Sequence, residues 1–169
     1  MSDVFFKEMN IPLRKYKLKT GGKNHGAMTG QQLEKIEEIL LTEKPDLVLV
    51  YGDTNSTLAG ALAATKLHIP IAHVEAGLRS FNKKMPEEIN RILTDQVSDY
   101  LFVPSVGAKQ NLLNEGVGEE KIFVVGDIMY DVSLYYKEKM VTPNWSDSLN
   151  LNNFILCTIH RAENTDDAE

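Results

Sequence analysis

The sequence predicts an α/β protein built on a parallel, doubly wound sheet. Residues 47–51 and 69–74 form apolar runs without polar alternation, which is typical of strands buried on both faces of a parallel sheet. Segments with helical periodicity separate such runs, and this alternation favours a doubly wound sheet. Polar residues follow both runs directly, and ligands of open α/β sheets bind beyond the carboxyl ends of the strands.

The expected elements follow one another along the chain. A short helix is expected at 4–9. Strands are expected at residues 47–51, 69–74, 100–103, 122–125 and 154–159. The helices between them should end near residues 42, 67, 97, 115 and 139.

The expected helix starts carry residues suited to that place. Side-chain oxygens there accept backbone N–H groups, and proline loses nothing at the first helical position. These residues are Thr29, Thr54 or Asn55, Pro86 and Ser105. The helix that starts at Pro86 should bury Ile89, Ile92, Leu93 and Val97.

The ends of the chain suggest an incomplete protein. No strand precedes the first helix, and no helix covers the last expected strand. We expect a partial N-terminal domain at 1–140, a linker at 141–153, and the first strand and loop of a second domain at 154–169.

The composition excludes several classes of function. A net charge of −6 argues against a nucleic-acid surface, and no apolar run reaches the length that spans a bilayer. The single Cys157 suits a reducing compartment, so we expect a cytoplasmic protein. The chain has no Cys/His spacing typical of zinc and no GxGxxG motif, so neither a metal nor a dinucleotide cofactor is expected.

Asp53 and Glu75 each follow an expected strand. With His73 and Arg79 they should gather at one edge of the sheet, where several carboxylates indicate proton chemistry. Two structural interpretations compete with this one. Asp53 or Thr54 could cap the next helix, and Glu75 could form a buried salt bridge with Arg79.

Two further motifs hold candidate residues. Glu87, with Glu88 beside it, lies in the first turn of a helix, where glutamates also serve as ordinary dipole partners. His160 and Arg161 follow the strand at 154–159. A lone histidine is more often structural, but a His-Arg pair at a strand end suits a phosphate or acid–base work.

Together the segments GDTNST, HVEAGLR, PEEINR and HRAEN resemble the non-hydrolysing UDP-N-acetylglucosamine 2-epimerases, in order and in spacing. The resemblance covers nearly the whole chain. It implies a Rossmann-like parallel sheet that is one half of a GT-B architecture of two Rossmann-like domains, with the active site in the cleft between the domains. Family members are about twice as long, and their GTRPE-like loop and most of the second domain, which holds the uridine and diphosphate, have no counterpart here.

The resemblance also implies a reaction, in which a proton leaves the second sugar carbon, UDP is eliminated, and UDP then adds back to a 2-acetamidoglucal intermediate. Asp53 and Glu75 match the proton-transferring acids, with Glu87 as a third catalytic acid and His160 as the catalytic histidine. Arg79 and Arg161 would bind substrate, with Arg161 and His160 stabilising the departing phosphate. No cofactor is implied. The partners would be a UDP-sugar destined for surface polysaccharide and, at full length, a second copy.

Four alternatives stay open on the sequence alone. VGDIMYD and TIHRAENTDD also resemble epimerases of UDP-diacetamido-glucuronic acid. The others are a hydrolysing epimerase that releases N-acetylmannosamine, a non-catalytic nucleotide-sugar-binding module, and a GT-B glycosyltransferase, which the clustered acids disfavour. Whichever holds, we expect this chain alone to be inactive.

Overall fold

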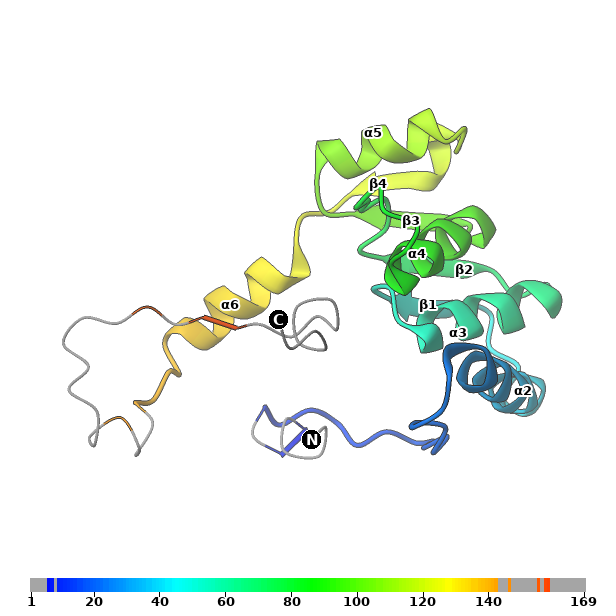
Figure 1. Ribbon diagram of the computed structural model, residues 1–169, viewed down its shortest axis with the longest axis horizontal. Coiled ribbons are helices and arrows are strands. Elements are labelled where there is room, and N and C mark those ends of the chain that lie inside the picture. Colours follow the sequence, from blue (N-terminus) through cyan, green and yellow to red (C-terminus); the bar gives the residue numbers. More distant parts are fainter. Residues whose placement is uncertain (1–5, 8, 143–145, 147–154, 156, 159–169) are drawn as a thin grey trace, which may run out of the picture. The chain divides into compact units, whose positions relative to one another are not determined.

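The computed structural model describes residues 6–7, 9–142, 146, 155 and 157–158. The chain divides into two units, residues 1–130 and 131–169. In the first unit, four parallel strands form one sheet in the order β1-β2-β3-β4 (Figure 1). They are β1 (Val48–Tyr51), β2 (Ile71–Val74), β3 (Tyr100–Val103) and β4 (Ile122–Val124).

Helices precede, separate and follow these strands, which confirms the predicted α/β fold. They are α2 (His25–Glu43), α3 (Asn55–Lys66), α4 (Pro86–Val97), α5 (Val106–Asn114), the short 3₁₀ helix η1 (Glu119–Lys121) and α6 (Ile128–Lys137). The expected caps are confirmed at α3 and α5, where the Thr54 and Ser105 hydroxyls accept backbone N–H groups.

The predicted start of α2 was wrong. The helix begins at His25, so Thr29 lies inside it, and Asn24 occupies the N-cap position without a side-chain hydrogen bond. Gly26 and Gly30 lower the intrinsic helix propensity of this first segment. Packing of α2 against α3 outweighs that preference.

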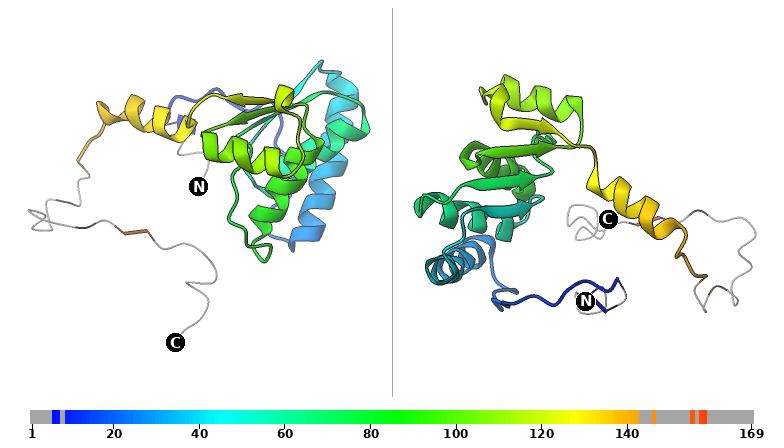
Figure 2. Two further views of the ribbon diagram at one scale, coloured as in Figure 1. Left: turned by 90° about the horizontal axis from the view of Figure 1, so that it is seen from above. Right: turned by 180° about the vertical axis from the view of Figure 1, so that it is seen from behind.

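The helices α3, α4 and α5 lie along one face of the sheet (Figure 2), and α2 packs on α3. The strand order advances in one direction, and right-handed crossovers that advance in one direction place every helix on the same face. On the other face Leu49 and Tyr51 are 45% and 56% exposed, so the prediction that β1 is buried on both faces was wrong. The described strands are singly wound, whereas the sequence favoured a doubly wound sheet.

The fully buried residues of α4 are polar, contrary to the prediction, whereas Val97 packs partly buried against the apolar core as expected. Ile89 and Leu93 are exposed, whereas Glu88, Thr94 and Asp95 are buried. The two carboxylates are buried because cations and backbone N–H groups meet them. Hydrophobic periodicity carries no information about such partners, so the sequence pattern missed the buried polar residues of α4.

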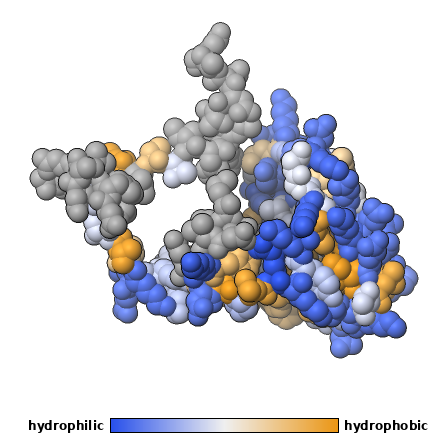
Figure 3. Space-filling view, turned by 90° about the horizontal axis from the view of Figure 1, so that it is seen from below, coloured by the Kyte–Doolittle hydropathy of each residue, from blue (hydrophilic) through white to orange (hydrophobic). Residues whose placement is uncertain are grey.

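The expected linker at 141–153 and strand at 154–159 lie mostly outside the described residues and stay predictions. Within the described part of the chain, no helix combines the length and the apolar character that crossing a membrane requires. Most of the residues coloured in Figure 3 are hydrophilic, with separate hydrophobic patches between them.

Gly77 is the glycine at which an added methyl group should be least tolerated. Its φ is +76°, and a Cβ would lie 2.4 Å from the Ala108 carbonyl oxygen. Gly77→Ala should therefore lower the free energy of unfolding by more than the roughly 1–2 kcal/mol of left-handed backbone strain alone. Gly116→Ala is the matched control in urea unfolding, because its φ is +84° and no atom lies within 4 Å of the added group. Equal losses in the two variants would show that the loop after Gly77 moves freely.

Candidate active site

Asp53 lies at the carboxyl edge of the sheet, two residues beyond β1, and helix α4 holds it there. Arg91 Nε and Nη2 lie 3.0 Å and 2.8 Å from its Oδ2 atom. Asn90 donates from its side-chain amide to the Asp53 carbonyl oxygen at 2.8 Å. The capping interpretation of Asp53 was wrong, because the N-cap of α3 is Thr54.

Glu75 directly follows β2 at the same edge, in left-handed backbone with φ +69°. This conformation is costly for a residue with a side chain, and such strain concentrates at functional sites. A Cβ on Gly52 would lie 3.3 Å from Glu75 Oε2, so the carboxylate lies against the turn that precedes Asp53. The predicted Glu75–Arg79 salt bridge was wrong, because Arg79 pairs elsewhere.

The environment of Glu75 favours its protonated form. Burial raises the pKa of its carboxyl group, and the negative charges of Asp127 and Asp53 raise that pKa further. Charge interactions with His73 and Arg91 lower that pKa without cancelling the rise. Two neighbouring carboxylates thus have different surroundings, one bound by a guanidinium and the other partly desolvated, which suits distinct acid and base roles.

Glu87 and Glu88, adjacent in sequence, have different environments. Glu87 is exposed at the rim of a cavity of about 360 Å³ that also contains Asp53 and Asn90. Glu88 is buried, accepts the backbone N–H groups of Ser80 and Phe81, and binds Arg91 at 2.7 Å. The geometry favours Glu87 as the residue that can reach a ligand.

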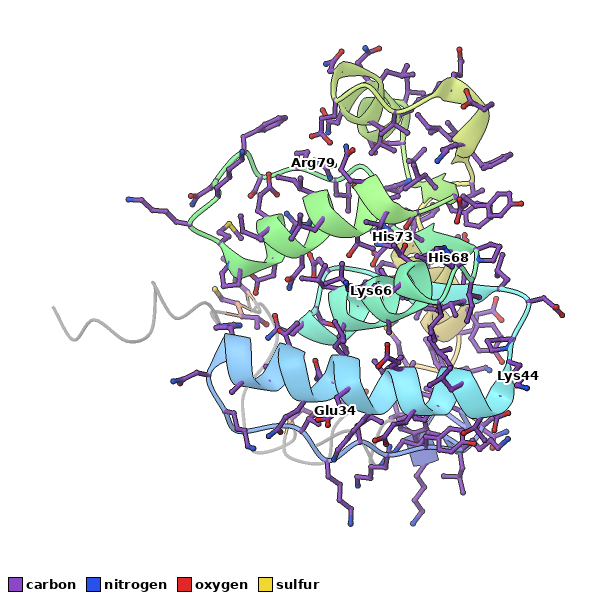
Figure 4. All side chains as sticks on the ribbon, turned by 90° about the vertical axis from the view of Figure 1, so that its right-hand side faces the viewer. Glu34, Lys44, Lys66, His68, His73 and Arg79 are labelled. Atoms are coloured by element: carbon purple, nitrogen blue, oxygen red, sulfur yellow. The ribbon has the colours of Figure 1, made fainter. Side chains whose placement is uncertain are left out.

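Arg79 is buried, with its side chain 1% exposed (Figure 4). It binds Asp95 Oδ2 at 2.8 Å and both carboxylate oxygens of Glu115 at 2.7 Å and 2.6 Å. Burial opposes its charge, but these two carboxylates together raise the pKa of Arg79. Its expected role in substrate binding stays a prediction, and the contacts favour a structural one. A second cavity, about 450 Å³, includes Arg79 but none of Asp53, Glu75 and Glu87.

Sequence reasoning missed Arg91, Asn90 and Asp95 as parts of the site. Arg91 lies one helical turn after Glu88, so the spacing could have indicated a cation on the same face of α4. No sequence signal indicated that this face is buried. His160 and Arg161 lie outside the described residues, and among the described ones no group of three His, Cys, Asp or Glu side chains could hold a metal ion.

The raised pKa of Glu75 makes a prediction about stability and pH. Below the unfolded-state pKa, near 4.5, Glu75 is protonated in both the folded and the unfolded state, so its ionisation does not change the free energy of unfolding. As pH rises through the folded-state pKa, the folded state loses stability relative to a neutral side chain. Glu75→Gln should therefore stabilise the fold, by an amount that grows from acidic to neutral pH in urea unfolding.

Glu119→Gln provides the control, because Lys109 lowers the pKa of exposed Glu119. Its effect on the free energy of unfolding should not become more favourable as pH rises. A Glu75→Gln effect that is constant with pH would contradict the assigned environment of Glu75.

Comparison with known proteins supports the family resemblance that the sequence motifs indicated. The family model described as UDP-N-acetylglucosamine 2-epimerase matches residues 1–169. The UDP-2,3-diacetamido-2,3-dideoxy-D-glucuronate 2-epimerase of Pseudomonas aeruginosa is 59% identical over 169 residues, which are 99% of this chain and 47% of that protein. The UDP-N-acetylglucosamine 2-epimerase of Methanocaldococcus jannaschii is 52% identical over 174 residues, which cover 100% of this chain and 48% of that protein.

Solved structures agree with the fold. The M. jannaschii UDP-GlcNAc 2-epimerase in complex with UDP-GlcNAc and UDP matches with a TM-score of 0.91 at 53% identity, over 99% of this chain and 47% of that one. This confirms the Rossmann-like fold expected for half of a GT-B-type epimerase. The chain spans about half the length of the relatives it matches. On the family match and these identities, the chain belongs to the UDP-N-acetylglucosamine 2-epimerase family.

Proposed function

We propose that the whole protein containing this chain interconverts UDP-N-acetylglucosamine and UDP-N-acetylmannosamine. The observation that carries the proposal is the placement of Asp53 and Glu75. They follow adjacent parallel strands, one held by Arg91 and the other with a raised pKa. Epimerisation at a carbon needs one group that removes a proton and another that returns it on the opposite face.

The reaction assigns each group a step. Asp53, oriented by Arg91, accepts the proton from the second sugar carbon. The electrons of that C–H bond form a double bond between the second and first carbons. At the same time the bond between the first carbon and UDP breaks, and UDP leaves with the electrons of that bond. Protonated Glu75 then returns a proton to the other face of the second carbon while UDP re-forms its bond to the first. Glu87 is proposed as a third participant, and His160 and Arg161 as the cations that stabilise the departing phosphate.

A second substrate has its own support. The relative from P. aeruginosa, a UDP-diacetamido-glucuronate epimerase, is 59% identical over 99% of this chain. UDP-2,3-diacetamido-glucuronic acid is therefore the alternative substrate. The same acids would act on it, because the chemistry at the second carbon is unchanged.

The test is a product assay of the whole protein with each UDP-sugar in D₂O. Deuterium should enter the second carbon, and the epimeric UDP-sugar should accumulate without free sugar. Free N-acetylmannosamine with UDP would instead show a hydrolysing enzyme. An absence of both turnover and deuterium exchange with either substrate would identify a non-catalytic binding module.

We also propose the organisation of the whole protein. Residues 1–140 form part of the first domain, 141–153 a linker, and 154–169 the start of the second, with the active site between the domains. The whole protein is proposed to be a cytoplasmic homodimer that binds a UDP-sugar, whereas the 169-residue chain alone is inactive. Sedimentation of both forms and calorimetry with UDP test these statements, and micromolar UDP binding by the chain alone would contradict the last of them.

A further inference from the structure

His73 lies in the middle of β2, fully buried, and both of its ring nitrogens face acceptors. Nδ1 lies 2.7 Å from Asp95 Oδ1, and Nε2 lies 2.8 Å from the Gly52 carbonyl oxygen. A neutral imidazole has one N–H donor and one acceptor nitrogen, so it satisfies only one of these two contacts. A doubly protonated ring satisfies both, and a buried acceptor left facing a lone pair would be costly.

The charges around the ring also balance only if it is positive. Asp95 binds His73 through Oδ1, and its Oδ2 receives Arg79 at 2.8 Å and the Gly77 N–H at 3.1 Å. Arg79 in turn pairs with Glu115. Two carboxylates and one guanidinium leave this cluster with one negative charge. The Glu115 side chain is 30% exposed, whereas Arg79 and Asp95 are buried. An imidazolium brings the net charge of the cluster to zero, which lowers the cost of burying its inner groups.

The partner of Nε2 links His73 to the candidate acids. Gly52 forms the turn between β1 and Asp53, and the Glu75 carboxylate lies against it. His73 also lies near enough to Glu75 for a charge on its ring to lower the pKa of the Glu75 carboxyl group. Its neighbours in the sheet, Val50 and Leu101, carry no charge.

We infer that His73 is a positioning residue of the active site: it is held as an imidazolium by Asp95 and fixes the Gly52 carbonyl, and hence the turn that carries Asp53 and faces Glu75. This inference deepens the proposed function and rests on it for its catalytic consequence. The protonation state itself does not depend on the reaction. Arg79 and Glu115 contribute indirectly, because Arg79 binds Asp95 and Glu115 binds Arg79.

Nitrogen-15 NMR of the 169-residue chain at pH 8.5 tests the protonation state without any assay. Ordinary histidines, with pKa values of about 6.5, are neutral there and carry one N–H. The chain has 4 histidines, and we expect one ring, absent from the spectrum of a His73 variant, to carry protons on both nitrogens. Four singly protonated rings would overturn the inference. An arrangement in which the shared proton resides on Asp95 would give this result, because His73 would then carry one N–H.

Two variants of the whole protein test the positioning role. The amide nitrogen of glutamine corresponds in place to Nε2 and that of asparagine to Nδ1. His73→Gln therefore keeps a donor for Gly52, whereas His73→Asn keeps one for Asp95 alone. We expect kcat to fall by about 10²-fold in His73→Asn, as for a misplaced catalytic group, and clearly less in His73→Gln, with little change in KM.

The pH profile separates positioning from simple destabilisation. Loss of the positive charge in His73→Gln should raise the pKa of Glu75, because His73 lowers that pKa. The limb of the pH–rate profile that reflects the ionisation of Glu75 should therefore move to higher pH. Exposed His68, at the end of α3 (Figure 4), gives the control variant His68→Asn, which should change neither kcat nor the profile. Equal kcat losses in both His73 variants with an unmoved profile would overturn the positioning role. If the unmodified protein turns over neither UDP-sugar, the proposed function fails while the NMR result still decides the state of His73.

Discussion

Replacing either carboxylate at the strand ends by its amide should abolish most turnover of the whole protein while leaving it folded. We expect Asp53→Asn and Glu75→Gln each to lower kcat by about 10²- to 10⁴-fold, the usual contribution of a general acid or base. An amide keeps the shape of the side chain but cannot exchange a proton at neutral pH. The measurement is steady-state epimerisation of UDP-N-acetylglucosamine beside thermal unfolding of the same samples.

The controls come from carboxylates away from this edge. Glu119, exposed and paired with Lys109, should tolerate Glu119→Gln without loss of kcat. Deuterium exchange at the second carbon should disappear in Asp53→Asn, because that variant lacks the proposed base. Near-normal kcat with unchanged unfolding in both amide variants would show that Asp53 and Glu75 are structural.

Removing the charge of Arg79 should destabilise the chain by about 3–5 kcal/mol, the usual loss when one partner of a buried ion pair is removed. Arg79→Met leaves Asp95 and Glu115 without their shared cation, and the Asp95 carboxylate is fully buried. Methionine fills much of the same volume, so the loss reports mainly on charge. Urea unfolding of the 169-residue chain measures it.

Lys109→Met is the matched control, because its ion pair with Glu119 is largely exposed. It should change the free energy of unfolding by less than about 1 kcal/mol. The opposite outcome for Arg79→Met would be unchanged unfolding together with a raised KM for the UDP-sugar. That result would restore the substrate-binding role that the sequence resemblance implied for Arg79.

Local sequence signals determined the elements of this fold. The strand at Tyr100–Val103, the Ser105 cap and the proline that starts α4 are each specified by a few adjacent residues. The same signals placed Asp53 and Glu75 directly after adjacent strands, because parallel strands present their carboxyl ends at one edge. Periodicity, capping and turn chemistry act over one or two turns of chain, so they can be recognised without the fold.

The partners of the charged residues were decided only by tertiary structure. The sequence suggested Arg79 as the partner of Glu75, four positions away. In the structure Arg79 binds Glu115, the C-cap residue of α5, and Arg91 from α4 binds Asp53. The buried face of α4 was likewise misjudged, because its carboxylates are buried with cations and N–H groups that come from elsewhere in the chain. Whether a charged side chain is buried depends on partners that only the folded chain brings within about 3 Å, the reach of a hydrogen bond. Hydrophobic pattern carries no information about those partners.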